Sequence, residues 1–287
     1  VDEEHNYLAG FFLVSNCQNW VTSQALRDPA AVSPPLQTTP KDLVRMALAQ
    51  GGEIMVSTYN EPLITSEWAV EVFKEARAAG LMTGYVSNGN GTPRVLEYIR
   101  PWVDLYKVDL KSFDDRHYRQ LGGRLQPILD TIRRLYEMET WLEVLTLLVP
   151  GFNDSDDELA RLTEFIAGVS QEIPWHVTAF HKDYKMTGPE NTRAEDLIRA
   201  AEIGRRAGLR FIYAGNLPGQ VGDLENTYCP ACRELLVERF GYHIRKYRLT
   251  SGGACPSCRR SVPGRWAESF RGQITDRPFV PRLPRRT

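Results

Sequence analysis

The sequence predicts an α/β fold, in which a partial (β/α) barrel of six or seven parallel strands precedes a small C-terminal four-cysteine module of the zinc-ribbon type. Three observations predict it. Short apolar runs alternate with amphipathic helical stretches up to about residue 215, and each run has the length of a strand rather than a helix. Alternation of this kind favours parallel pairing, because each helix carries the chain back across the sheet. Two CxxC pairs then follow.

The apolar runs and the helix signals between them justify the elements in order. The expected strands are residues 11–14, 53–57, 82–87, 105–110, 142–148, 176–180 and 210–213. The first helix after the second strand is indicated by an apolar stripe of Trp68, Ala69, Val72, Phe73 and Ala76, with Gly80 as its C-terminal stop. Two capping boxes, Ser155 with Glu158 and Thr192 with Glu195, are expected to begin two later helices. This number of strand–helix units favours a barrel over a sandwich.

The chain divides by composition into three parts. We expect the barrel over residues 1–219, a metal-binding ribbon over 220–268 and a flexible basic tail over 269–287. Beyond Cys258 there are eight arginines against two acidic residues, with four prolines. Such a tail either contacts an acidic partner or stays solvated, and the second is the ordinary state of a charged segment.

Composition excludes several classes of protein. The net charge is −1, so no overall field favours nucleic acid, and no apolar run is long enough to span a membrane. The N-terminus lacks the basic and apolar regions of a signal peptide. Paired CxxC cysteines suit a reducing compartment, so we expect a cytoplasmic protein. The first residue is Val1 rather than Met, which we interpret as a truncated, processed or alternatively started chain.

The four clustered cysteines predict a metal site. Cys229 and Cys232 form one CxxC pair, and Cys255 and Cys258 form another after 22 intervening residues. Two such turns supply the four thiolates of a tetrahedral Zn²⁺ site. Iron in a rubredoxin-like site is the alternative. Because four thiolates leave no open position on the metal, we expect a structural role for either ion.

Polar residues follow most of the predicted strands, at the edge where a barrel of this class carries its active site. They are Ser57–Glu61, Ser87–Gly89, Asp109–Ser112, Pro150–Asp154, His181–Lys185 and Gly215–Asn216. Each alone is ordinary turn chemistry, but together they favour a polar ligand site. Asp109 and Lys111 alternate along one strand and therefore share a face, either as ligand-binding groups or as an ion pair. Cys17, taken alone, is typical of a small buried apolar residue.

These motifs, in their order, resemble a known family. They are Cys17-Gln18-Asn19-Trp20, Thr58-Tyr59-Asn60-Glu61-Pro62, Ser87-Asn88-Gly89, Val108-Asp109-Leu110-Lys111-Ser112-Phe113, Pro174-Trp175-His176-Val177, Phe180-His181-x-Asp183-Tyr184-Lys185, Gly215-Asn216-x-Pro218-Gly219 and Asn226-Thr227-Tyr228-Cys229-Pro230. Together they look like the radical SAM enzymes of the AmmeMemoRadiSam system, relatives of the pyruvate formate-lyase activating enzymes. The similarity extends from Cys17 to Trp266.

The resemblance implies a [4Fe–4S] cluster and S-adenosylmethionine, with reductive cleavage of the cofactor to a 5′-deoxyadenosyl radical that abstracts hydrogen. It implies that Glu61 with Asn60 holds the amino end of the cofactor, that Tyr59 belongs to the same cofactor-binding set, and that Ser87 and Asn88 line its carboxylate or ribose. Asp109 and Lys111 would lie near the same groups, and His181, Asp183 and Lys185 would face the substrate. A flavodoxin or ferredoxin would supply the electron. The substrate stays open between a glycyl-radical protein, a peptide and a small molecule.

One motif departs from the family pattern. A CxxxCxxC motif would place cysteines at positions 10, 14 and 17, where this chain has Gly10, Val14 and Cys17. A cubane cluster that keeps one iron open for the cofactor needs three thiolates, and Cys17 supplies one. The sequence therefore leaves two alternatives, a radical enzyme whose N-terminal segment is altered, or a cluster-free relative that binds S-adenosylmethionine or a protein partner. A third reading, in which the ribbon and the basic tail dock on nucleic acid or protein, is weaker.

Overall fold

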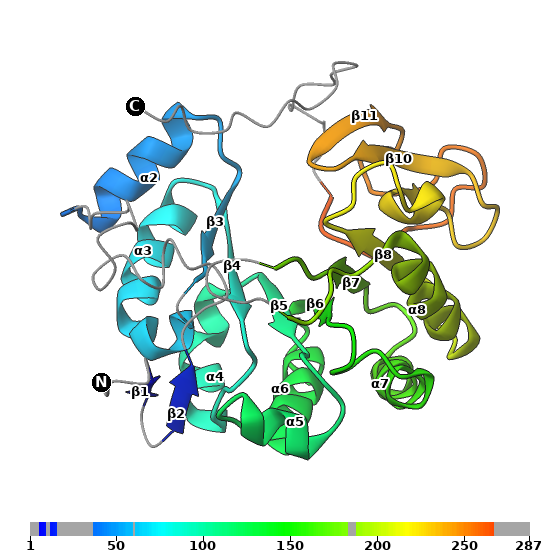
Figure 1. Ribbon diagram of the computed structural model, residues 1–287. Coiled ribbons are helices and arrows are strands. Elements are labelled where there is room, and N and C mark those ends of the chain that lie inside the picture. Colours follow the sequence, from blue (N-terminus) through cyan, green and yellow to red (C-terminus); the bar gives the residue numbers. More distant parts are fainter. Residues whose placement is uncertain (1–5, 10–11, 16–36, 60, 183–187, 267–287) are drawn as a thin grey trace, which may run out of the picture.

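A single parallel sheet organises the chain in the computed structural model, which describes residues 6–9, 12–15, 37–59, 61–182 and 188–266. Its six strands are hydrogen-bonded in the order β3-β4-β5-β6-β7-β8, the order of the sequence. The strands are β3 (Ile54–Ser57), β4 (Met82–Ser87), β5 (Leu105–Asp109), β6 (Trp141–Leu148), β7 (Trp175–Ala179) and β8 (Ile212–Gly215). Sequential parallel order with helices between successive strands gives the curved arrangement of Figure 1.

Helices connect the strands and cover the outer face of the sheet (Figure 1). They are α2 (Pro40–Ala49), α3 (Ser66–Ala78), α4 (Pro93–Ile99), α5 (Asp115–Gln120), α6 (Leu125–Glu137), α7 (Asp156–Val169) and α8 (Ala194–Arg206). Short 3₁₀ turns are η1 (Pro62–Thr65), η2 (Arg100–Trp102) and η3 (Gly222–Glu225). None of the helices in the described part of the chain combines the length and the apolar character that crossing a bilayer requires.

The two faces of the sheet differ in burial. On β5, Tyr106 and Val108 are buried in the core that the helices form, whereas Lys107 and Asp109 are half-buried on the other face. The same alternation runs along all eight residues of β6. Because strand side chains alternate between faces, every second residue of β5 to β8 lines an inner face that can receive a ligand.

The prediction of a parallel α/β sheet is confirmed, with three local corrections. The run expected at 11–14 forms β2 (Phe12–Ser15), which pairs antiparallel with β1 (Asn6–Ala9) in a separate two-stranded sheet. Trp68 is 45% exposed, so the apolar stripe of α3 does not include it. Thr192 does not cap α8; it is buried and donates its hydroxyl to the Leu148 carbonyl at 2.5 Å. The helix begins at Ala194, where Asp196 accepts from the Arg193 amide.

The C-terminal cysteines lie in turns of a module that contains a small antiparallel sheet beside β8 (Figure 1). Its strands are β9 (Thr227–Tyr228), β10 (Leu235–Phe240) and β11 (His243–Tyr247), with β10 in the centre. The core of this module contains Leu236, Val237 and Val262, and Phe211 from the end of the barrel packs into the same cluster. The cysteine module and the barrel are therefore joined through shared apolar packing.

Candidate functional site

The carboxyl ends of β3, β4 and β5 bring several predicted residues together. The Glu61 carboxylate, after β3, accepts a hydrogen bond from the Ser87 hydroxyl at 2.7 Å and from the Asn88 amide at 2.7 Å. Ser87 ends β4, and its oxygen also accepts from the Gly89 amide. Residues from two neighbouring strand ends therefore fix one carboxylate in place. This is the edge at which parallel α/β sheets bind ligands.

The backbone before Glu61 is strained to place that carboxylate. Tyr59 and Glu61 both have positive φ angles, 65° and 54°, which L-residues with a side chain adopt at a cost. The Leu63 amide donates to the Glu61 carboxylate at 3.3 Å and so anchors the turn that begins η1. Strain of this kind is found where a site needs a side chain in one position.

Burial controls the charge of Glu61. Desolvation raises the pKa of this carboxyl, the bonds from Asn88, Ser87 and Leu63 oppose that rise, and the nearby charge of Asp109 adds to it. A half-buried carboxylate next to a second acidic group gains most from a cationic ligand, because the cation removes both the desolvation cost and the repulsion. These acceptor groups therefore fit the ammonium group of an amino acid, which donates hydrogen bonds.

Asp109 and Lys111 form an ion pair, with Nζ and Oδ2 3.3 Å apart. Both side chains stay partly exposed, so the pair borders the inner face without closing it. The main chain beneath them is held firmly. The Asn153 side chain donates to the Lys111 carbonyl at 2.6 Å, and the Lys111 amide donates to the Tyr118 hydroxyl at 3.0 Å. The ion pair of the sequence interpretation is present, and the role of Asp109 and Lys111 as ligand-binding groups stays a prediction.

A buried polar cluster holds the residues that follow Lys111. The Ser112 hydroxyl donates to Glu158 at 2.5 Å and lies 3.0 Å from Nδ1 of His117, and the Phe113 amide donates to Glu158 at 2.7 Å. Ser155 caps α7 as predicted, accepting from the Glu158 amide at 3.3 Å. The Glu158 side chain, expected to return to the cap, instead crosses to the end of β5. Sequence spacing gave no signal for this contact.

The remaining predicted site residues are not assembled in the same way. Tyr59 is exposed, and its ring makes no contact that defines a site in the described chain. His181 is exposed just after β7. Cys17, Asn60, Asp183 and Lys185 lie outside the described residues. Their predicted roles at the cofactor and the substrate stay predictions.

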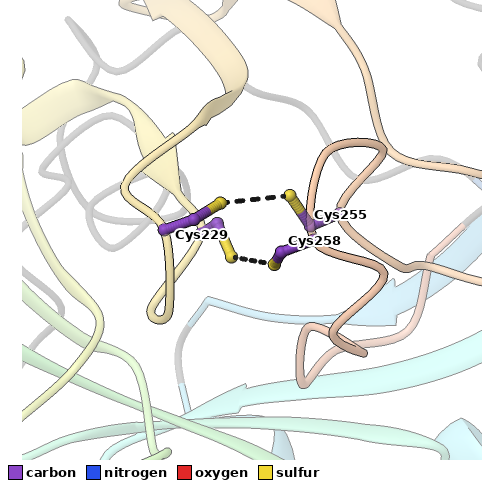
Figure 2. A group of neighbouring side chains, drawn as sticks. Cys229, Cys255 and Cys258 are labelled. Carbon is purple, nitrogen blue, oxygen red and sulfur yellow. Dashed lines mark hydrogen bonds between the residues drawn. The ribbon is translucent and has the colours of Figure 1, made fainter.

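The four C-terminal cysteines converge on one point, as predicted. Their sulfurs all lie within 4.8 Å of one another. Figure 2 shows the pairs across the site, with Cys229 Sγ 3.5 Å from Cys258 Sγ and Cys232 Sγ 3.6 Å from Cys255 Sγ. A tetrahedral Zn²⁺ with bonds of about 2.3 Å separates its sulfurs by roughly 3.8 Å. The spacing therefore fits a four-thiolate metal site.

The two CxxC turns are built alike. In each, the amide four residues after the first cysteine donates to that cysteine's carbonyl, Arg233 to Cys229 and Arg259 to Cys255, at 3.0 Å in both cases. Both arginines have positive φ angles, 61° and 63°. Cys229 and Cys255 are buried, whereas Cys232 and Cys258 are exposed. The site thus has one dry side and one side open to solvent.

The local environment prepares one thiol for ionisation. Burial opposes ionisation of Cys229, but amides of Cys232 and Ala231 and the adjacent thiols donate to its sulfur, and the pKa falls to about 7. The pKa of Cys232 is raised, because the amide bond from Glu234 is outweighed by burial and by the three neighbouring sulfurs. A divalent cation would remove this repulsion between thiolates.

Sequence reasoning missed a polar row on the inner face. Glu143 of β6 lies 2.8 Å from Nε2 of His176 on β7, and the His176 ring stacks on Tyr213 of β8 with centroids 5.1 Å apart. Lys107 of β5 is the register partner of Glu143. The sequence did contain a signal for this row, because Lys107 and Glu143 are charged residues inside apolar strand runs. Each has a buried residue on both sides.

Comparisons with known proteins agree with this architecture. A family model described as the Radical SAM superfamily matches residues 16–163. The chain is 32% identical over 239 residues to an uncharacterized protein of Methanocaldococcus jannaschii, covering 83% of this chain and 70% of the relative. It is 28% identical over 183 residues to the pyruvate formate-lyase-activating enzyme of Staphylococcus aureus, covering 59% of this chain and 72% of the enzyme. Among solved structures, Streptococcus suis SuiB bound to S-adenosylmethionine has a similar fold (TM-score 0.53, 14% identity, 64% of this chain and 45% of SuiB).

Proposed function

Because the chain belongs to the Radical SAM superfamily, we propose that it binds S-adenosylmethionine at the carboxyl ends of β3, β4 and β5. The observation that carries the proposal is the Glu61 carboxylate, held by Ser87 and Asn88 and destabilised by burial. Such a group pairs with the cofactor's ammonium. SuiB, whose structure was solved with S-adenosylmethionine bound, shares the fold that presents this edge.

The chain's own residues divide the binding between them. Glu61 would accept hydrogen bonds from the ammonium, and the Asn88 side chain would line the carboxylate or ribose. The Lys111 side chain would attract the cofactor's carboxylate. Asp109 would keep the Lys111 ammonium in position through their ion pair. The sulfonium of the cofactor is itself cationic, so the two acidic side chains at this edge favour it electrostatically.

Membership of the superfamily supports S-adenosylmethionine-dependent radical chemistry, which a reduced [4Fe–4S] cluster supplies when it is bound. The residues of this chain do not fit that cluster. Counted back from Cys17, a CxxxCxxC spacing would place the other two thiolates at Gly10 and Val14, and the four C-terminal cysteines form their own site near β10. We therefore assign no step through a cluster, and we propose a barrel that binds the cofactor without one. If a cluster is present, a flavodoxin or ferredoxin would supply its electron.

We propose a structural Zn²⁺ for the cysteine module. The spacing of the sulfurs supports four-thiolate coordination, and a closed shell of thiolates leaves no position for a substrate. Elemental analysis distinguishes zinc from iron directly.

Two measurements test the proposed function. Isothermal titration calorimetry with S-adenosylmethionine, on protein purified without iron, should show one binding site per chain; absence of binding to folded protein would overturn the proposal. Anaerobic incubation with iron and sulfide, followed by their quantification, tests the cluster separately. We expect no acid-labile sulfide. Retention of about four sulfides per chain, together with cleavage of the cofactor, would instead establish the radical enzyme.

A further inference from the structure

A second group of charged residues lies on the inner face of the sheet. It comprises Lys107 on β5, Glu143 on β6, His176 on β7 and Arg239 on β10, and we call it the inner cationic cluster. Lys107 precedes Asp109 by two residues, so both side chains point to the same face, with Lys107 about 7 Å further from the strand end. The cluster therefore lies deeper in the barrel than the proposed cofactor edge.

Positive groups outnumber negative ones in this cluster. Glu143 is the one carboxylate among these four side chains. It accepts a hydrogen bond from Trp141 Nε1 at 3.1 Å and pairs with His176 at 2.8 Å. Lys107 has no carboxylate of a described residue within ion-pair distance. It acts on Glu143 through its charge without a direct contact in the described chain.

Arg239 reaches the same place from the cysteine module. Its guanidinium lies over the Tyr213 ring, 5.6 Å from the centroid, and donates to the Thr227 hydroxyl at 2.8 Å and to the Glu225 carbonyl at 3.3 Å. These acceptors are neutral. Tyr213 in turn stacks on His176, which connects Arg239 to the rest of the cluster. The hydrogen-bond acceptors of this half-buried arginine are neutral, and the charge of Glu143 acts on its guanidinium without a direct hydrogen bond.

The cluster is reachable from solvent. The side chains of Glu143 and His176 are 34% and 27% exposed, and Lys107 and Arg239 are half-buried rather than sealed. The hydrogen bond between His176 and Glu143 uses Nε2, and Nδ1 of His176 has no hydrogen-bond partner among the described residues. The cluster thus offers an ammonium and a guanidinium, beside an imidazole, on side chains that solvent reaches.

We propose that the inner cationic cluster binds a small anion, a carboxylate or phosphate group of the substrate. Guanidinium and ammonium groups are the preferred partners of both anions. An anion here would compensate the charges of Lys107 and Arg239, and it would accept from Nδ1 of His176 when that ring carries both protons. As a substrate site the cluster rests on the proposed function, whereas its binding of an anion does not depend on the cofactor.

Phosphorus NMR with inorganic phosphate as the probe tests the site, because line broadening detects binding in the millimolar range. Ionic strength is kept constant with sodium chloride. We expect saturable binding that weakens at least about ten-fold, a loss of about 1.4 kcal/mol, in Lys107→Met and in Arg239→Gln. Lys246→Gln is the matched control, because it removes a module cation that pairs with Glu238. Circular dichroism verifies that each variant is folded.

A second titration, with S-adenosylmethionine, separates this site from the cofactor edge. We expect phosphate binding to persist at saturating cofactor, and Lys107→Met to bind the cofactor as the unsubstituted protein does. Absence of saturable phosphate binding, or binding that both variants retain, would overturn the proposal. So would loss of cofactor affinity in Lys107→Met, since Lys107 would then belong to the cofactor site. Failure of cofactor binding with intact phosphate binding would reject the proposed function alone.

Discussion

Glu61 shows how a single side chain can be prepared for a ligand. Its carboxylate is held by residues of two strand ends, its backbone occupies the left-handed region, and burial raises its pKa. The backbone conformation and the burial both cost free energy in the unliganded protein, and the hydrogen bonds offset part of that cost. A cationic ligand would recover part of that cost on binding, which is why this residue rather than Tyr59 dominates our expectations for the edge.

We predict that Glu61→Gln lowers the affinity for S-adenosylmethionine by about 10- to 100-fold, the range expected for loss of a charge-assisted hydrogen bond. In the unsubstituted protein the affinity should also fall as the pH is lowered, beginning at a higher pH than for an ordinary glutamate, because protonation removes the charge. Calorimetry across pH checks both effects. Glu67→Gln, which changes an exposed carboxylate on α3, is the control; equal losses in both variants would contradict the prediction.

Glu143 gives a prediction on acid stability. Burial disfavours its charge, but the contacts with His176, the bond from Trp141 and the charge of Lys107 prevail, and its pKa falls to about 2. A carboxyl with a lowered folded pKa stabilises the protein above pH 4.5 and loses that contribution as the pH falls toward about 2. The positive charge of Arg239 also interacts with the Glu143 carboxylate.

We therefore expect the unfolding free energy of the unsubstituted protein to fall between pH 5 and pH 2 by roughly 1–2 kcal/mol more than that of Glu143→Gln, after allowance for solvent screening. Urea titrations at several pH values measure this difference. Glu164→Gln, an exposed position on α7, should follow the unsubstituted protein. Parallel curves for all three proteins would show that Glu143 contributes nothing.

At the scale of single elements, the turn after β4 depends on one glycine. Gly89 has a φ of 76°, and a Cβ there would lie 2.6 Å from Val108 Cγ1 and 3.0 Å from Ile128 Cγ2. The turn therefore needs both the left-handed conformation and the missing side chain. It sets the direction in which Ser87 and Asn88 reach Glu61.

Gly89→Ala should lower the unfolding free energy by about 2–4 kcal/mol, the sum of a left-handed alanine and an overpacked core. Gly168→Ala is the control, because that helical glycine has open space around it and gains helix propensity of up to about 1 kcal/mol. The midpoints of urea unfolding compare the two variants. A Gly89→Ala protein as stable as the unsubstituted one would contradict the strain described here.

Local signals predicted the elements well where one face of each was buried. Apolar runs located the six parallel strands to within about two residues, because each is packed against helices on its outer face. Trp68 and Thr192 were misplaced because residue type alone does not tell an exposed aromatic from a buried one, or a cap from a buried threonine. The contact of Glu158 with Ser112 and Phe113 joins segments over forty residues apart, which no local pattern encodes.

The candidate site was predicted only in part. Residues that end neighbouring strands, such as Ser87 and Asp109, could be placed together from topology. The four cysteines could be placed from spacing. Arg239 could not be predicted, because it comes from the separate module and its neighbours depend on how the module packs beside β8.

At the scale of the whole molecule, the cysteine module depends on its metal. Among the described residues, its buried cluster has seven members, of which two are cysteines and one is Phe211 from the barrel, so apolar packing alone leaves the two CxxC turns weakly held. Metal coordination supplies folding free energy in modules of this size.

Cys255→Ser should lower the metal content from about one ion per chain to near zero and increase hydrogen exchange in β9 to β11 while leaving β3 to β7 protected. Elemental analysis and exchange mass spectrometry measure the two effects. Ser257→Ala, within the same turn, keeps all four sulfurs and serves as the control. One bound ion per Cys255→Ser chain would exclude the four-cysteine site.

The position of Arg239 on β10 has a practical consequence for anyone who trims this protein. A chain ending before Thr227 keeps all six parallel strands and would pass as a complete barrel. In that fragment, Tyr213 would lose its contact with the Arg239 guanidinium. An assay of ligand binding on the fragment would therefore not report the binding of the whole chain.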